Sequence, residues 1–194
     1  MTSIDTLQSV SLGRPGPTLL SIARAAISTA LGRTAKVAED AVWLQALAAC
    51  FVTLTQQGQL RGCIGTLEAR RTLLDDVKAN AVTAALCDPR FSPLTATELD
   101  NTAIEVSLLS PMQAMRFDSE AHALTQLQPG VDGVLFEYER YRSTFLPQVW
   151  EQLPTTSEFI AQLKRKAGLP PDFWASGVRL HRYTVIKWQE TERS

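Results

Sequence analysis

The sequence predicts an α+β protein, layered in the α/β manner, in which helices flank an antiparallel sheet. Segments with helical spacing of apolar residues alternate with short runs that have strand-like alternation. Two pairs of these runs are joined by tight turns and read as hairpins, which favours antiparallel pairing. The same order of elements occurs twice, so we expect one domain over residues 1–194, made of two pseudo-repeated subdomains at about 17–115 and 116–190.

The composition narrows the class of protein. Hydrophobic residues make up 45% of the 194 residues and charged residues 20%, which supplies a core and argues against disorder. The formal net charge of −1 gives no global attraction to nucleic acid or to an acidic membrane. No apolar stretch approaches the roughly 20 residues that span a bilayer. The N-terminus lacks the pattern of a signal peptide, so we expect a soluble cytoplasmic protein.

The cysteines and histidines do not follow a metal-site pattern. Cys50, Cys63 and Cys87 contain no C-x-x-C pair, and the only histidines are His122 and His181. A structural zinc site needs four well-placed ligands, so we expect no metal site, and the sequence names no cofactor. The odd number of cysteines suits a reducing compartment.

The first half of the chain contains two helices, a hairpin and a strand. Thr72 is typical of a helix N-cap, and Asp88-Pro89 ends that helix because the residue before proline avoids the α region. Thr95 with Glu98 forms a second capping pattern. In order, we expect a helix at 18–32, a short helix within 41–48, strands at 50–55 and 60–66, a helix at 72–88, a helical turn at 95–99 and a strand at 102–110.

The second half repeats this order. We expect a helix around 119–127, strands at 134–138 and 141–146, helices at 148–152 and 156–167, and a strand at 178–188, with irregular ends at 1–15 and 189–194. Units of this kind bury their helices on one face of a sheet, and two of them can share one sheet. Gly62–Thr66 and Ser143–Gln148 then occupy equivalent positions, and we expect a pocket between them.

The segment Leu60-Arg61-Gly62-Cys63-Ile64-Gly65 most strongly suggests a site. Glycine weakens a strand because it packs nothing, so two glycines here are expected to leave room for another group against the backbone. Strict alternation puts Arg61, Cys63 and Gly65 on one face of the strand, and Leu60, Gly62 and Ile64 on the other. We therefore expect a guanidinium and a thiol to line one small open space.

Both of these side chains have a functional and a structural interpretation. Cys63 is a catalytic nucleophile if a cation such as Arg61 activates its thiol, or else a small buried core residue. Arg61 either clamps a carboxylate or phosphate of a ligand or forms a structural ion pair with Glu105. The sequence leaves both alternatives open.

Further candidates for ligand binding are Gly62, Asp88, Arg90, Glu105 and Phe145. Asp88 and Arg90 either contact a ligand or end the helix and bind local backbone. Phe145 either lines the pocket or fills the core at the end of a strand. Because the named donors are arginines, we favour a small anionic or nucleotide-like ligand.

The hexapeptide at 60–65 closely resembles the six-residue signature of the AMMECR family. Other segments agree with this family in the same order, namely Phe51-Val52-Thr53-Leu54, Asp88-Pro89-Arg90-Phe91, residues 105–110, Pro129-Gly130 with 132–134, residues 144–150, and Leu163 with 166–168. The resemblance covers about residues 17–190. It implies an α/β protein with two subdomains around an antiparallel sheet.

The resemblance also implies partners. Bacterial and archaeal members of the family are associated with a Memo-type protein and a radical-SAM protein, as component A of the AmmeMemoRadiSam system. The resemblance supplies no established reaction. We therefore expect a cytosolic accessory protein with a small-ligand pocket at the 60–65 strand. The alternatives are a cysteine-dependent enzyme that uses Cys63 and a pure protein-interaction module.

Overall fold

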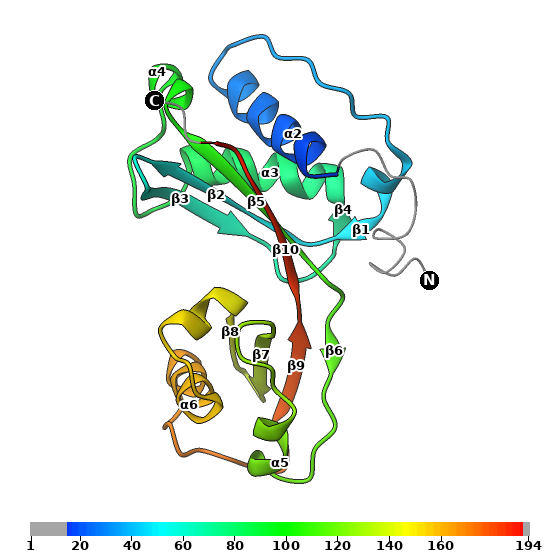
Figure 1. The fold of residues 1–194 in the computed structure, drawn as a ribbon, viewed down its shortest axis with the longest axis vertical. Coiled ribbons are helices and arrows are strands. Elements are labelled where there is room, and N and C mark those ends of the chain that lie inside the picture. The colour runs from blue at the N-terminus through cyan, green and yellow to red at the C-terminus, as the bar shows by residue number, and fades with distance from the viewer. Residues whose placement is uncertain (1–14, 192–194) are drawn as a thin grey trace. The chain divides into compact units, whose positions relative to one another are not determined.

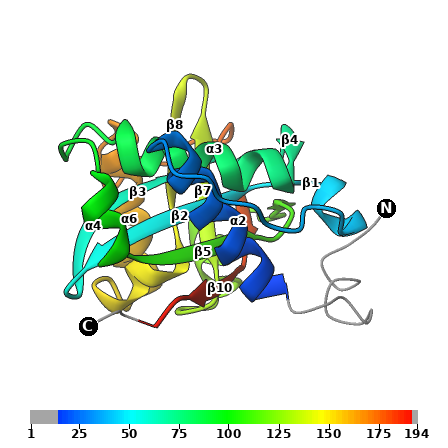
Figure 2. The ribbon, with the colours of Figure 1, turned by 90° about the horizontal axis from the view of Figure 1, so that it is seen from above.

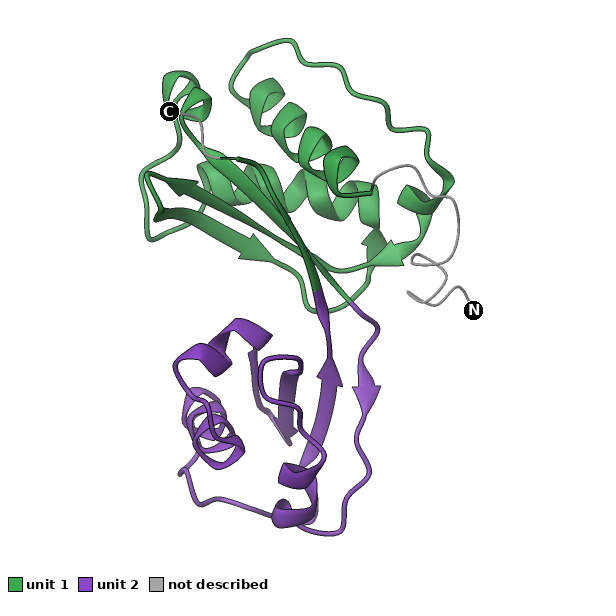
Figure 3. Ribbon diagram, viewed as in Figure 1, with its two compact units in different colours: residues 1–109, 186–194 green, residues 110–185 purple. Residues whose placement is uncertain are grey.

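The computed structural model describes residues 15–191, which form two compact units (Figure 3). Unit 1 comprises the chain up to Leu109 together with the segment from Ile186 onward, and unit 2 runs from Ser110 to Val185. The irregular ends expected at 1–15 and 189–194 lie mostly outside the described residues. Within residues 15–191, no helix combines the length and the apolar character that crossing a membrane requires.

Unit 1 is a four-stranded sheet with two long helices on one face (Figures 1 and 2). The strand order is β10-β5-β2-β3, and β2 pairs antiparallel with both β3 and β5. A separate ribbon joins β1 to β4. The elements are α2 (Pro15–Ala30), η1 (Val42–Gln45), β1 (Leu47–Ala48), β2 (Cys50–Gln56), β3 (Gln59–Gly65), β4 (Arg71–Thr72), α3 (Leu73–Leu86), α4 (Ala96–Asp100), β5 (Ala103–Leu109) and β10 (Val185–Gln189).

The helices of unit 1 form where the sequence predicts caps and an apolar stripe. Thr72 accepts a hydrogen bond from the Asp75 backbone N–H, and Thr95 forms a complete capping box with Glu98. The core between helices and sheet contains fully buried residues of α2, α3, β2 and β5, among them Ile22, Ile27, Val77, Ala81, Val52, Leu54, Ile104 and Val106. Alanines on the inner face of α3 let that helix lie close to the sheet.

Unit 2 has its own sheet and its own core. The strand order is β6-β9-β7-β8, and α6 packs against β8. The Trp150 ring stacks on Phe159, with centroids 3.7 Å apart, at the centre of this core. The elements are β6 (Gln113–Ala114), α5 (Glu120–Thr125), β7 (Gly133–Tyr138), β8 (Tyr141–Phe145), η2 (Pro147–Glu151), α6 (Thr156–Lys166) and β9 (Arg179–Tyr183).

The α+β prediction is confirmed, and the predicted repeat appears as a shared strand order. The hairpin and its returning strand lie in the order β5-β2-β3 in unit 1 and β9-β7-β8 in unit 2. The two repeats could have shared one sheet, but each unit has its own four-stranded sheet.

The single strand predicted at 178–188 is two strands in different sheets. They are β9 and β10, separated by Thr184. Thr184 exchanges hydrogen bonds with Ser110, donating its N–H to Ser110 Oγ (2.9 Å) and accepting from the Ser110 N–H (2.9 Å). Alternation of apolar residues reports a strand, but it carries no information on which sheet that strand joins.

A half-buried arginine fixes the C-terminal strand in unit 1. Arg24 of α2 forms an ion pair with Glu190 and donates to the carbonyls of Leu99 (3.1 Å) and Thr102 (2.7 Å). The Glu190 carboxylate also accepts the Ile104 N–H at 3.1 Å. One guanidinium therefore joins α2, the end of α4 and the end of β10.

Candidate functional site

The 60–65 segment lies in β3, at the edge of the first sheet. The register pairs Leu54 with Gly62 and Thr55 with Leu60, which leaves Arg61 as an extra residue in a β-bulge. Beyond the bulge the register is regular, and Cys63 pairs with Thr53. From Gly62 to Gly65 the side chains therefore alternate between the two faces, as predicted. The alternation argument that placed Arg61 beside Cys63 did not include this bulge, and a shared face for the two side chains stays a prediction.

The two glycines of β3 accommodate parts of the chain itself. A Cβ atom on Gly62 would lie 2.3 Å from the Ala84 carbonyl oxygen of α3, and one on Gly65 would lie 2.2 Å from the Phe51 ring. We expected these glycines to leave room for another group against the backbone, and in both cases that group belongs to the chain itself. The space beside Gly62 holds a helix backbone, and the space beside Gly65 holds an aromatic ring.

Arg61 forms a structural ion pair, although with a different partner from the one expected. Its Nη2 lies 3.2 Å from Glu98 Oε1, and its side chain is only 12% exposed. The guanidinium also lies 6.0 Å from the centre of the Phe91 ring. The Thr95 backbone N–H and hydroxyl, with Arg61 adding a smaller effect, lower the pKa of Glu98. Glu105, the expected partner, instead lies near Lys187.

Asp88 and Arg90 bind the free edge of β3. The Asp88 carboxylate accepts the Cys63 N–H at 2.9 Å, and Arg90 Nη2 donates to the Cys63 carbonyl at 3.1 Å. The two side chains also form an ion pair with each other at 2.6 Å. They therefore occupy the place of a further strand, which protects an edge that would otherwise be open to pairing.

The environment of Asp88 strongly favours its charged form. The hydrogen bonds from Arg90 hold the pKa of the Asp88 carboxyl well below its usual range, and the backbone N–H groups of Cys63 and Arg90 add to this effect against the opposing effect of burial. A buried carboxylate that is charged at neutral pH is suited to a structural role at this edge.

A row of four polar side chains crosses the sheet on the face opposite α2 and α3. Cys63 of β3 and Glu105 of β5 each pair with Thr53 of β2, and the Thr53 hydroxyl donates to Cys63 Sγ at 3.4 Å. Lys187 Nζ of β10 lies 3.8 Å from Glu105 Oε1. We call Cys63, Thr53, Glu105 and Lys187 the polar row. Every strand of the sheet contributes one member.

The polar row combines four kinds of hydrogen-bonding group. It contains a half-buried thiol and hydroxyl, a carboxylate that is 20% exposed and an ammonium group that is 40% exposed. Ser107 Oγ donates to Glu105 Oε1 at 3.1 Å, which orients the carboxylate. Such a row can bind a small molecule through donors and acceptors together.

The structure brings together only part of the predicted site. Cys63 and Glu105 lie in the polar row, whereas Phe145 belongs to unit 2. There its ring packs edge-on against Phe159, with centroids 5.3 Å apart. Of the two segments between which we expected a pocket, 62–66 lies in unit 1 and 143–148 in unit 2, and that pocket stays a prediction.

Thr53 and Lys187 were missed by the sequence analysis. Alternation along β2 places Thr53 on the face opposite Val52 and Leu54, so the sequence predicts the face of the sheet on which Thr53 lies. Lys187 carried no comparable signal, because its place depends on β10 lying beside β5.

A buried polar cluster on α3 was also missed. The Asp76 carboxylate accepts hydrogen bonds from the Cys50 N–H (2.8 Å), Thr66 Oγ1 (2.7 Å), Arg71 Nε (2.7 Å) and Asn80 Nδ2 (3.0 Å). Asp76 and Asn80, four residues apart, interrupt the apolar stripe of the helix, and that interruption was the available signal. Burial and the Asp76 charge raise the pKa of Cys50 far above its usual range. The cluster ties α3 to the start of β2.

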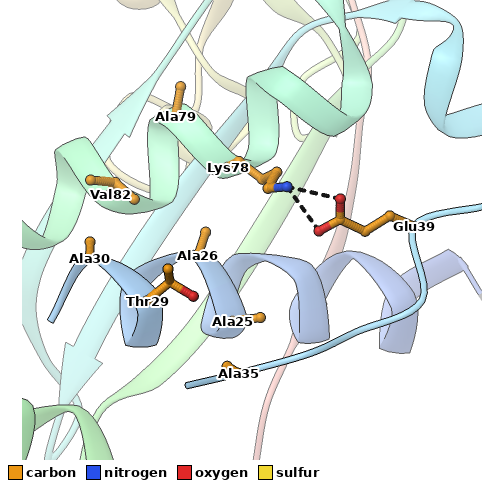
Figure 4. A pocket seen from close by; sticks show the side chains of 9 residues that line it. All are labelled: Ala25, Ala26, Thr29, Ala30, Ala35, Glu39, Lys78, Ala79 and Val82. Carbon is orange, nitrogen blue, oxygen red and sulfur yellow. Dashed lines mark hydrogen bonds and ion pairs between the residues drawn. The ribbon is translucent and has the colours of Figure 1, made fainter. Parts of the chain in front are cut away.

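A pocket of about 570 Å³ lies between α2, α3 and the segment that contains Ala35 and Glu39 (Figure 4). Its lining consists mainly of alanine methyl groups, and Lys78 Nζ bridges both Glu39 carboxylate oxygens at 2.9 Å. None of the side chains that the sequence singled out as site candidates lines it. The pocket is a cavity with few side chains that can donate or accept a hydrogen bond to a ligand.

Replacing Gly62 with alanine is expected to destabilise the protein. The new Cβ would meet the Ala84 carbonyl oxygen, and a helix backbone cannot move aside as a side chain can. We expect Gly62→Ala to lower the free energy of unfolding by at least about 2 kcal/mol in urea titrations. Gly177→Ala is the control, since its Cβ would meet the Tyr138 side chain at 3.3 Å, and a loss below about 1 kcal/mol is expected. Equal losses in both variants would contradict the close helix approach.

The Asp88 interaction predicts a pH-dependent loss of stability in Asp88→Asn. The folded-state pKa is depressed, so the carboxylate stabilises the fold above the ordinary unfolded-state pKa of about 3.9 and loses this effect as pH falls below it. We expect the variant to be less stable than the parent by about 2 kcal/mol at neutral pH.

The difference between Asp88→Asn and the parent should shrink between about pH 4 and pH 2, as measured by urea unfolding across this range. Asp100→Asn is the control, because its ion pair with Arg33 is exposed and contributes little at any pH. A difference that is the same at pH 3 and pH 7 would rule out the proposed charge interaction.

Comparisons with known proteins agree with this fold. The AMMECR1 family profile matches residues 20–188. A protein of Methanothermobacter thermautotrophicus is 38% identical over 185 residues, covering 90% of this chain and 94% of its own. A protein of Methanocaldococcus jannaschii is 38% identical over 151 residues, which cover 74% of this chain and 73% of the relative. The crystal structure of an uncharacterized protein from Pyrococcus horikoshii superposes with a TM-score of 0.80 at 32% sequence identity. The match covers 91% of this chain and 92% of that protein. The chain belongs to the AMMECR1 family.

Proposed function

We propose that this protein is a cytoplasmic accessory protein that binds a small polar ligand at the polar row. The observation that carries the proposal is the line of thiol, hydroxyl, carboxylate and ammonium groups, each from a different strand of one sheet. Groups on a sheet are held in place by the hydrogen-bond ladder, so a ligand meets a preorganised surface.

The polar row supports a different class of ligand from the anion that the arginines suggested. Arg61 pairs with Glu98 and Arg90 pairs with Asp88, so each guanidinium already has a carboxylate partner, while Arg61 Nη1 has no hydrogen-bond partner among the described residues. The polar row itself carries one positive and one negative charge. We therefore propose a small molecule that has both hydrogen-bond donors and acceptors.

The proposal includes a Memo-type protein and a radical-SAM protein as partners. This part rests on the resemblance to the AMMECR family, whose bacterial and archaeal members are associated with these proteins. In this arrangement the polar row holds a small molecule, and a partner protein supplies the chemistry.

A cysteine-dependent enzyme is the second candidate, because the Cys63 thiol accepts a hydrogen bond from Thr53 and lies in the same row as Glu105. Within the polar row, the groups that could act as a base for the thiol are the Glu105 carboxylate and the Lys187 amine. The two candidates differ in how fast Cys63 reacts.

Alkylation with iodoacetamide, followed by peptide mass spectrometry, compares the three cysteines within one molecule. We expect Cys87, which is exposed, to react first, Cys63 to react more slowly, and the buried Cys50 to react last. The Cys63→Ala and Cys87→Ala variants assign the labelled peptides. A Cys63 that reacts about tenfold faster than Cys87 would favour the enzyme over the binding protein.

The ligand itself can be sought by native mass spectrometry of purified protein after incubation with cell extract. We expect an added small-molecule mass on the parent that is lost in Glu105→Gln, which keeps the shape but removes the charge. Cys87→Ala is the control and should retain that mass, since Cys87 lies outside the polar row. An added mass that Glu105→Gln and Thr53→Val both retain would place binding elsewhere and end the proposal.

A further inference from the structure

A pocket of about 480 Å³ lies within unit 2, beside the pairing of β6 with β9 and the start of α5. This volume falls in the range of small-molecule sites. His122 and His181, the only histidines of the chain, both line it.

The charged side chains of this pocket favour an anion. The lining contains two guanidinium groups, of Arg116 and Arg179, and one carboxylate, of Asp118, while the Glu137 carboxylate lies outside the lining and beside Arg179. The Asp118 side chain is 97% exposed, so water screens its charge. Arg179 is 63% exposed and lies 3.8 Å from Glu137, an ion pair that an incoming anion displaces at small cost.

His181 has hydrogen-bonding capacity that the described residues do not use. Its Nδ1 is buried and has no hydrogen-bond partner within residues 15–191, and the closest carboxylate oxygen, Glu137 Oε2, is 3.6 Å away. Two histidines in one pocket could also serve as ligands of a metal ion. The described residues contain no group of three histidine, cysteine or carboxylate side chains placed to hold a metal ion.

The remaining wall of the pocket is apolar. Met115 and Phe117 pack against the core of unit 2, and the Phe117 ring lies 5.6 Å from the ring of Trp174. Val178 and Leu180 are buried beneath them on the β9 side. An inorganic anion would leave this wall unused, whereas an organic body attached to the anion would cover it.

We propose that this pocket is a second binding site, which takes a small phosphomonoester with an apolar or aromatic body. Arg116 and Arg179 bind the phosphate oxygens through their planar guanidinium groups. The imidazoles of His122 and His181 add hydrogen bonds, and Phe117 with Met115 contacts the organic part. All of these residues lie in unit 2, whereas the residues of the polar row lie in unit 1.

Proton NMR of the full chain tests the proposal, because two histidines give only two sets of ring signals. Phenyl phosphate is the probe, and His122→Gln assigns the signals. We expect both sets to shift in a saturable manner, with an affinity on the order of 1 mM or tighter. Inorganic phosphate should bind more weakly, because it does not cover the apolar wall, and phenol should not bind.

The combined Arg116→Ala and Arg179→Ala variant should weaken phenyl phosphate binding at least about tenfold, which corresponds to 1.4 kcal/mol. Arg140→Ala is the matched control, since Arg140 is an exposed arginine of unit 2 that does not line the pocket. Glu105→Gln in the polar row should also leave binding unchanged, which separates this proposal from the proposed function. Unchanged binding in the double arginine variant, or no saturable shift at either histidine, would overturn it.

Discussion

The close approach of α3 to β3 at Gly62 is the constraint on which the first unit depends. The Ala84 carbonyl oxygen lies where a side chain on residue 62 would begin, so only glycine lets the helix lie this close. Asp88 follows two residues after the end of α3, and this approach brings its carboxylate to the Cys63 N–H. The same contact turns Gly62 towards the helices and Cys63 towards the opposite face of the sheet.

The signature segment mainly builds structure, and Cys63 is its one member of the polar row. Asp88 and Arg90 satisfy the backbone of Cys63 at the open edge of β3, and Glu98 pairs with Arg61. Charged residues that bind one another and the backbone stabilise an edge strand. A sequence motif can therefore mark a demanding place in the fold as well as a binding site.

The two units share a strand order but carry different chemistry. In each, the strand that returns after the helix pairs with the first strand of the hairpin. Unit 1 presents the mixed polar row, whereas unit 2 gathers both histidines and two arginines around one pocket. Function on a repeated scaffold is set by the side chains placed on it rather than by the scaffold.

The sequence alone determined the fold class, the helix caps at Thr72 and Thr95, and the hairpin that contains Cys63, because local propensity and periodicity decide such features. It also identified the family. Only the tertiary structure decided that Arg61 sits in a bulge, that Glu98 rather than Glu105 pairs with it, and that β9 and β10 enter different sheets. The physical reason is that ion pairs, registers and sheet membership depend on residues far apart in the chain, whose meeting no local pattern records.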